Sequence, residues 1–301
     1  MLDSTIERYT IQEIQTIEKT CIRVPLNESV LTMIQVIYNE VCSPPRMHVV
    51  NNSKETKSIH KSSFKTTPMT TRSGIDVSID TIRKLLNMCT DTTYDQLYPK
   101  LIHELNVIQN EHYNLEDLDK LNNIMFHILS SVMVYSKLYA TLYSKVYHTY
   151  AFLQDTITDR VACFRESILQ IQYHNSTNEY EQFCKNNKDN LKRRTTGAFF
   201  VHLIPYGIVN VVEINTILLF IQNEILKRIC IQNQTEIVDE LTELESILYL
   251  TGQTYIHISD EWTELQDNLK HIASLKPKEY VSLSAKSIFQ HMDMVDSING
   301  V

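Results

Sequence analysis

From Asp76 to the end of the chain, apolar residues recur every three to four positions, which is the spacing of an amphipathic helix. Four consecutive apolar stripes cover residues 79–89, 94–105, 118–132 and 135–150, and the third begins after a capping residue, Asn114. Further helices are predicted near residues 161–171, 196–204, 212–229, 237–250, 262–272 and 284–298. The polar run 172–190 between them is expected to be a long loop or a frayed helical extension.

Ten or so helices give about five pairs, at ~40–47 residues per pair. A pair that cannot bury its apolar stripes alone has to stack on the next pair. The pattern therefore predicts an all-α fold, a HEAT-repeat-like α-solenoid of about five antiparallel helix pairs over residues 76–301. Arms of this kind usually hold other proteins.

The first 75 residues differ from this body. Residues 1–42 contain two helical patterns, the second carried by Val30, Leu31, Ile34, Ile37, Tyr38 and Val41. Residues 43–75 are rich in Ser, Thr, Lys and Asn and have no sustained period, so we expect a flexible linker.

Charge is spread unevenly along the chain, whose net charge is −8. Residues 1–42 hold 6 acidic and 3 basic side chains, residues 43–75 hold 1 and 6, and residues 76–301 hold 29 and 19. The acidic body argues against broad phosphate binding by the helices. The basic linker is the better candidate for a weak contact with nucleic acid.

Candidate chemistry is sparse. The six cysteines are widely spaced without a CxxC pair, which is typical of reduced thiols in the cytoplasm. The most apolar window, 208–221, is interrupted by polar residues, so no contact with a membrane is expected. The usual nucleophile, phosphate-loop and zinc motifs do not occur, and the histidines have no ligand spacing. We therefore predict a protein that is not an enzyme and uses no metal or cofactor.

One basic cluster lies in the acidic body, just before Gly197. Its members are Lys185, Lys188, Lys192, Arg193 and Arg194. Two interpretations stay open. The cluster is either a solvated loop and helix start, or a basic ridge that pairs with an acidic protein surface or with phosphate.

Several sequence blocks in the same order resemble the middle domain of eukaryotic translation initiation factor 4 gamma. They are IRKLLNMCTDTTYDQL (82–97), NIMFHILSSVMVYSKLYATLYSKV (123–146), FRESILQ (164–170), LKRRTTGAFFVHLIPYGIV (191–209) and LESILYLTGQTY (244–255). Matching positions include Leu86, Asn87, Phe126, Tyr139, Ala140, Arg193, Arg194 and Gly197. The chain departs from the family at Met88, where a Lys is usual, and at 283–287, where only Lys286 remains of a basic segment.

The resemblance implies a translation-initiation scaffold that binds a 4A-type DEAD-box RNA helicase. The residues expected to contact the helicase are Phe64, in a segment similar to the family's upstream aromatic anchor, and Arg83, Asn87, Lys192, Arg193 and Arg194. In the same reading, the basic linker 43–75 is expected to contact mRNA weakly. The alternative is a related middle-domain adaptor of mRNA splicing, export, decay or nuclear cap binding.

The family also carries an upstream Y-x-x-x-x-L-Φ motif for a 4E-type cap-binding protein. Residues 8–15 match it in part, since Tyr9 is in place, Ile14 substitutes for Leu and Gln15 breaks the last apolar position. The candidate contacts are Arg8, Tyr9 and Ile14, on a short amphipathic helix. The other interpretation is an ordinary N-terminal helix of the fold.

Overall fold

The computed structural model describes residues 30–31, 74–154 and 156–299. The chain divides into two units, residues 1–66 and residues 67–301. In the first unit Val30 and Leu31 are helical and exposed. The sites predicted at Arg8, Tyr9, Ile14 and Phe64 lie outside the described residues.

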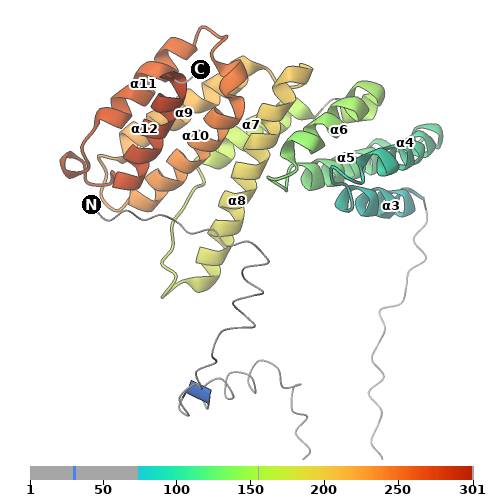
Figure 1. The fold of residues 1–301 in the computed structure, drawn as a ribbon. Coiled ribbons are helices and arrows are strands. Elements are labelled where there is room, and N and C mark those ends of the chain that lie inside the picture. Colours follow the sequence, from blue (N-terminus) through green and yellow to red (C-terminus); the bar gives the residue numbers. More distant parts are fainter. Residues whose placement is uncertain (1–29, 32–73, 155, 300–301) are drawn as a thin grey trace, which may run out of the picture. The chain divides into compact units, whose positions relative to one another are not determined.

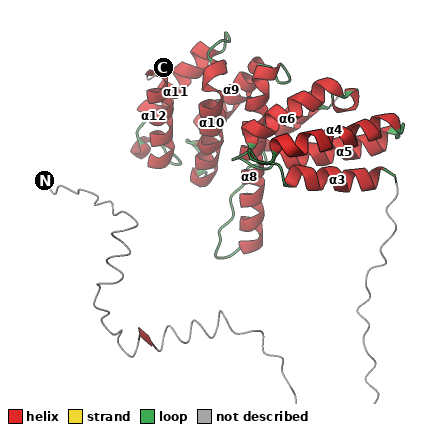
Figure 2. Ribbon diagram, turned by 45° about the vertical axis from the view of Figure 1, so that its right-hand side comes forward, coloured by secondary structure: helices red, strands yellow, loops and turns green. Residues whose placement is uncertain are grey.

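The described part of the second unit consists of helices and connecting turns (Figures 1 and 2), which confirms the predicted all-α class. Its ten α-helices are α3 (Ile75–Asn87), α4 (Tyr94–Asn110), α5 (Leu115–Leu129), α6 (Ser136–Thr149), α7 (Ile157–Ile168), α8 (Tyr180–Leu203), α9 (Val211–Arg228), α10 (Thr235–Ile256), α11 (Trp262–Ser274) and α12 (Ala285–Asn299). No described helix combines the length and apolar character needed to cross a bilayer.

Helices pack in a regular order. Neighbours in sequence pack together as α3 with α4, α5 with α6, α7 with α8, α9 with α10 and α11 with α12. Alternate helices also pack, as α3 with α5, α6 with α8, α8 with α10, α9 with α11 and α10 with α12. Most helices therefore touch both a sequence neighbour and a helix two places along the chain.

The apolar stripes form one continuous core. On α3 the buried positions Ile75, Ile79, Ile82 and Leu86 are spaced at three and four residues, as the sequence predicts. The aromatic stripe on α6 is also core. Its Tyr139 is almost fully buried, and its hydroxyl donates to the backbone carbonyls of Leu86 and Cys89.

Local sequence signals predict the start of α5 correctly and the start of α8 only in part. The side chain of Asn114 accepts a hydrogen bond from the Asp117 amide at 2.8 Å, so the predicted cap of α5 is confirmed. Of the two expectations for 172–190, a loop is present up to Glu179 and a helical extension from Tyr180 on, where α8 begins. Figure 1 shows this end of α8 extending beyond its neighbours. Lys, Glu and Gln are good helix formers, and the buried second half of α8 supports the solvated first half.

Helix α8 approaches its neighbours closely at Gly197. A β-carbon added there would lie 2.7 Å from a methyl group of Leu248 and 3.0 Å from the ring of Phe164. Both neighbours are themselves buried, so they have little room to move away. Glycine at this position lets α8 pack directly on α7 and α10.

A buried polar network joins the last four helices. His291 on α12 is fully buried, with Nε2 3.1 Å from a carboxylate oxygen of Glu245 on α10 and Nδ1 2.7 Å from the Ser287 carbonyl. Glu245 also accepts a hydrogen bond from Gln222 on α9, which donates to the Leu265 carbonyl on α11. Because a carbonyl only accepts, Nδ1 of His291 carries a proton, and a further proton sits between Nε2 and Glu245. Burial lowers the pKa of His291, but Glu245 and the two hydrogen bonds outweigh it and raise this pKa above 6.5.

A raised histidine pKa fixes the direction of a pH effect. The stability that the His291–Glu245 pair contributes is fully present below the unfolded pKa of about 6.5 and is lost as the pH rises through the higher folded pKa. We expect His291→Gln to lower the free energy of unfolding by about 1–3 kcal/mol at pH 6 and by less at pH 9. Urea titrations across this range measure the difference.

The control for this prediction is His271→Gln, at an exposed position on α11. This variant should follow the wild-type pH profile. An equal loss of stability from His291→Gln at pH 6 and pH 9 would show that the pair holds no additional proton.

Candidate functional site

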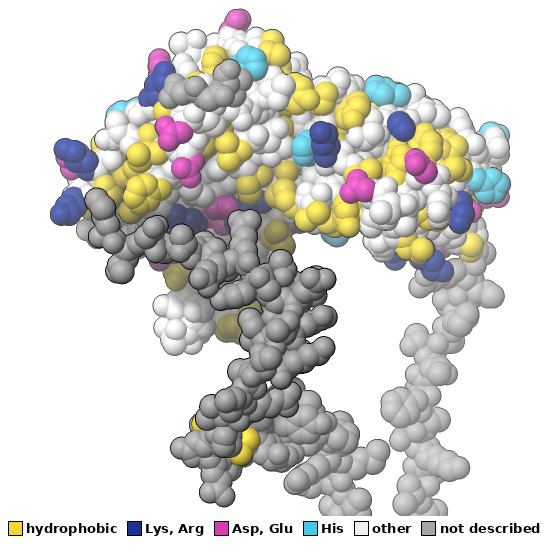
Figure 3. Space-filling view, viewed as in Figure 1, with side chains coloured by type: hydrophobic (Ala, Val, Ile, Leu, Met, Phe, Trp, Pro, Cys, Tyr) yellow, Lys and Arg dark blue, Asp and Glu magenta, His cyan; other side chains and the backbone are white. Residues whose placement is uncertain are grey.

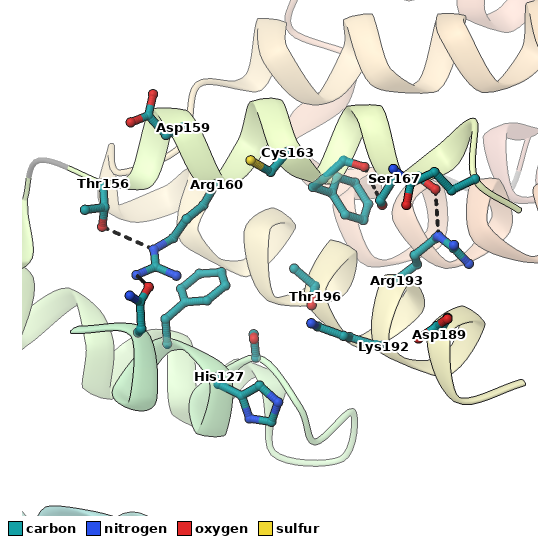
Figure 4. A pocket seen from close by; sticks show the side chains of 15 residues that line it. His127, Thr156, Asp159, Arg160, Cys163, Ser167, Asp189, Lys192, Arg193 and Thr196 are labelled. Atoms are coloured by element: carbon teal, nitrogen blue, oxygen red, sulfur yellow. Dashed lines mark hydrogen bonds between the residues drawn. The ribbon is translucent and has the colours of Figure 1, made fainter. Parts of the chain in front are cut away.

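A groove of about 710 Å³ lies between α5, α7 and α8 (Figure 4). Phe126 and Phe164 contribute to its floor. The charged side chains that line it are Asp159 and Arg160 from α7 and Asp189, Lys192 and Arg193 from α8, joined by His127 from α5. The groove therefore brings part of the predicted basic cluster together with residues that the sequence analysis did not select.

Arg160 is held in a fixed position on one wall. Its Nε donates to the Thr156 hydroxyl at 3.1 Å and its Nη2 to the Asn123 side-chain oxygen at 2.9 Å. Its guanidinium carbon lies 4.2 Å from the ring centre of Phe126, within the range of a cation–π contact. Burial lowers the pKa of Arg160, but guanidinium stays protonated at neutral pH. The result is a preorganised cation facing the groove.

Arg193, which the sequence analysis placed in a basic cluster, is buried in the structure. Only 9% of this residue is exposed, because its Nε donates to the Ser167 carbonyl at 2.8 Å and its Nη1 to the Asn190 side-chain oxygen at 2.5 Å. The bond to Ser167 ties α8 to the end of α7, and the bond to Asn190 lies within α8. Burial lowers the pKa of Arg193 as well. Arg193 is therefore neither solvated nor part of an exposed ridge, and it supports the fold as well as lining the groove.

The neighbours of Arg193 differ from it in their surroundings. Arg194 pairs with Glu240 on α10 at 3.3 Å, with about a quarter of its side chain exposed. Burial raises the pKa of Glu240, and the positive charge of Arg194 opposes that rise. Lys192 is exposed at the edge of the groove, and Lys185 and Lys188 are exposed further toward the start of α8.

The other predicted helicase contacts lie on α3. Arg83 and Asn87 are both exposed, one turn apart. The Arg83 side chain is 3.8 Å from Asp80, an exposed pair that contributes little to stability. Helix α3 packs on α4 and α5 and is separate from α8 in Figure 1. The structure thus does not gather the two predicted sets of helicase contacts into one cluster.

The described residues contain no group of three His, Cys, Asp or Glu side chains placed to hold a metal ion. Cys163 is exposed at the groove and Cys89 is buried, and burial raises the pKa of the Cys89 thiol.

Sequence reasoning missed Arg160 and His127. Arg160 follows Thr158 and Asp159 near the start of α7, outside any basic run, and its partners Asn123 and Phe126 come from a helix more than thirty residues earlier. His127 occupies a polar position of α5 that resembles any solvated helix face. No local spacing marks either residue, so only the packing of α5 on α7 and α8 shows that they share a groove.

Comparisons of the chain with known protein families and with curated proteins find no match.

The buried bonds of Arg193 distinguish it from Lys192. We expect Arg193→Met to lower the free energy of unfolding by about 1–3 kcal/mol, because the Ser167 carbonyl and the Asn190 side chain lose their donor. Lys192→Met should change it by less than about 0.5 kcal/mol, since the side chain is exposed. Urea unfolding followed by circular dichroism measures both. Equal effects would mean that Arg193 does not tie α7 to α8.

Proposed function

We propose that this chain is a helical scaffold of translation initiation that binds a 4A-type DEAD-box RNA helicase. The observation that carries the proposal is the repeated packing of helix pairs from α3 to α12. Contacts between neighbours in sequence together with contacts between alternate helices are what a HEAT-like α-solenoid of five pairs requires. In this proposal the protein acts in the cytoplasm by holding partners and performs no chemistry of its own.

The sequence blocks that resemble the initiation factor support this choice of partner. Their apolar positions, such as Leu86 and Phe200, are buried and serve the core. Asn87, in contrast, matches the family pattern but is exposed beside Arg83 at the end of α3. An exposed polar pair with little role in packing is a reasonable contact surface for a partner. Phe64 upstream is the proposed apolar anchor of the same interface.

The helicase interface leads to a direct prediction. The full chain should bind a 4A-type helicase and raise its RNA-dependent ATPase rate. The double variant Arg83→Glu with Asn87→Ala should weaken binding about tenfold or more, or roughly 1.4 kcal/mol, by placing a like charge against an acidic partner surface. Calorimetric titration at physiological salt measures the affinity. Phe64→Ala, titrated in the same way, should cost on the order of 1–4 kcal/mol if the ring is an anchor.

Lys270→Glu provides the matched control, because Lys270 is exposed on α11, away from α3 in sequence. It should bind the helicase as the wild type does. Wild-type affinity in the α3 double variant would remove α3 from the interface. If the wild-type chain bound no helicase at all, the related adaptors of splicing, export, decay or nuclear cap binding would become the better proposal.

The N-terminal segment is proposed to bind a 4E-type cap-binding protein through Arg8, Tyr9 and Ile14. Tyr9→Ala should abolish this binding, because it removes the largest apolar group of the motif. Gln15→Leu should tighten it by about 1–2 kcal/mol, because it restores the missing apolar contact. Calorimetry with the full chain measures both. If neither variant changes the affinity, the segment has another role.

A further inference from the structure

Three cations of the α5–α7–α8 groove lack a carboxylate partner. None of the ion pairs between described side chains includes Arg160, Lys192 or Arg193. Two carboxylates line the same groove, Asp159 and Asp189, so the lining carries a net charge of 3 − 2 = +1 with neutral histidine. This is a small positive site in a chain whose net charge is −8.

The positions of the two carboxylates make the site more positive at one end. Figure 4 shows the Asp159 side chain, at the rim of the groove, pointing away from Arg160, whereas His127 and Lys192 lie around the same space as Arg160. Asp189 acts electrostatically on Arg193 at the other end. The positive end therefore consists of Arg160 and Lys192, with the His127 ring beside them, and it is available to an incoming anion.

Rigidity favours binding at this end. Arg160 is fixed by Thr156, Asn123 and the ring of Phe126 before any ligand arrives. A fixed guanidinium loses little side-chain entropy when it forms hydrogen bonds to a carboxylate, and its planar fork matches the two carboxylate oxygens.

An apolar surface follows directly from the groove. Ser130 lines the groove, and the connection from α5 to α6 then exposes Val132, Met133 and Val134. Val134 is 86% exposed. A ligand that fits both the positive end of the groove and this apolar surface carries a carboxylate next to an apolar side chain.

A nucleic-acid strand fits the groove less well. Its successive phosphates would meet Asp189 as well as the cations, and the lining charge of +1 is small for a polyanion. On the face shown in Figure 3, acidic and basic side chains are interspersed among apolar ones without a broad basic area. The observations favour a ligand with a single negative charge at this point.

We propose that the groove binds a short acidic and apolar segment of a partner protein, with an Asp or Glu carboxylate between Arg160 and Lys192 and an apolar neighbour on Val132–Val134. This inference rests on the protein-binding role proposed above, but not on the helicase as the partner. The groove is thus a second docking site, on different helices from Arg83 and Asn87.

The test uses the full chain and a phage-displayed library of random 12-residue peptides as the probe. Peptides selected on the wild type should be enriched in Asp or Glu next to a large apolar residue. The most enriched peptide is then synthesised with a fluorophore, and its affinity is measured by anisotropy. Lys192→Glu should weaken binding at least tenfold, because it replaces an attractive charge with a repulsive one.

Lys188→Glu is the matched control, because Lys188 is an exposed lysine one turn earlier on α8 that does not line the groove. This variant should bind like the wild type. Replacing the acidic residue of the peptide by its amide should also weaken binding to the wild type, and Lys192→Glu should add little further loss. Losses that do not add in this way would place the peptide carboxylate beside Lys192.

Other outcomes would overturn the inference. Selected peptides without acidic residues, or equal affinities for wild type and Lys192→Glu, would remove the groove as an acidic-peptide site. A fluorescent 12-residue oligouridylate that binds the wild type but not Lys192→Glu, with no enriched peptide, would assign the groove to RNA. Because no helicase is present in these measurements, their result is independent of whether the helicase binds.

Discussion

The close packing of α8 against α7 and α10 is the constraint on which the rest of the structure depends. At Gly197 the absence of a side chain lets Phe164 and Leu248 approach the backbone of α8 more closely than a β-carbon would allow. Helix α8 also packs on α6, so it connects the earlier helices with the later ones. The same approach brings the end of α7 within reach of Arg193, and the wall of the groove follows from it.

The all-α class and most helix positions were predictable from the sequence because their signals are local. The stripe Ile79–Ile82–Leu86 and the cap at Asn114 depend on residues within one or two turns of each other, and both appear as expected. The first half of α8 was expected only as one of two alternatives, because its residues are mostly exposed and carry no apolar stripe. Its helical state depends on the buried half that follows it.

The candidate site was predictable only in part, because its contacts are distant in sequence. Arg193 reads as one charge in a basic run, yet its buried position depends on a carbonyl 26 residues earlier. Arg160 depends on Asn123, 37 residues earlier. Charge composition alone does not separate a buried arginine from an exposed lysine beside it. In the structure Lys192 is exposed, Arg193 is buried and Arg194 is paired with Glu240. These differences arise from the packing of α7, α8 and α10 and cannot be read from the local sequence.

The central claim is that a largely rigid helical body presents α3 to a 4A-type helicase. Hydrogen exchange of the full chain, measured by mass spectrometry with and without the helicase, tests it most directly. The account predicts slower exchange in peptides covering residues 60–90 when the helicase is bound, with unchanged exchange in α11 and α12. Unchanged exchange throughout the chain, or slowing confined to α11 and α12, would contradict it.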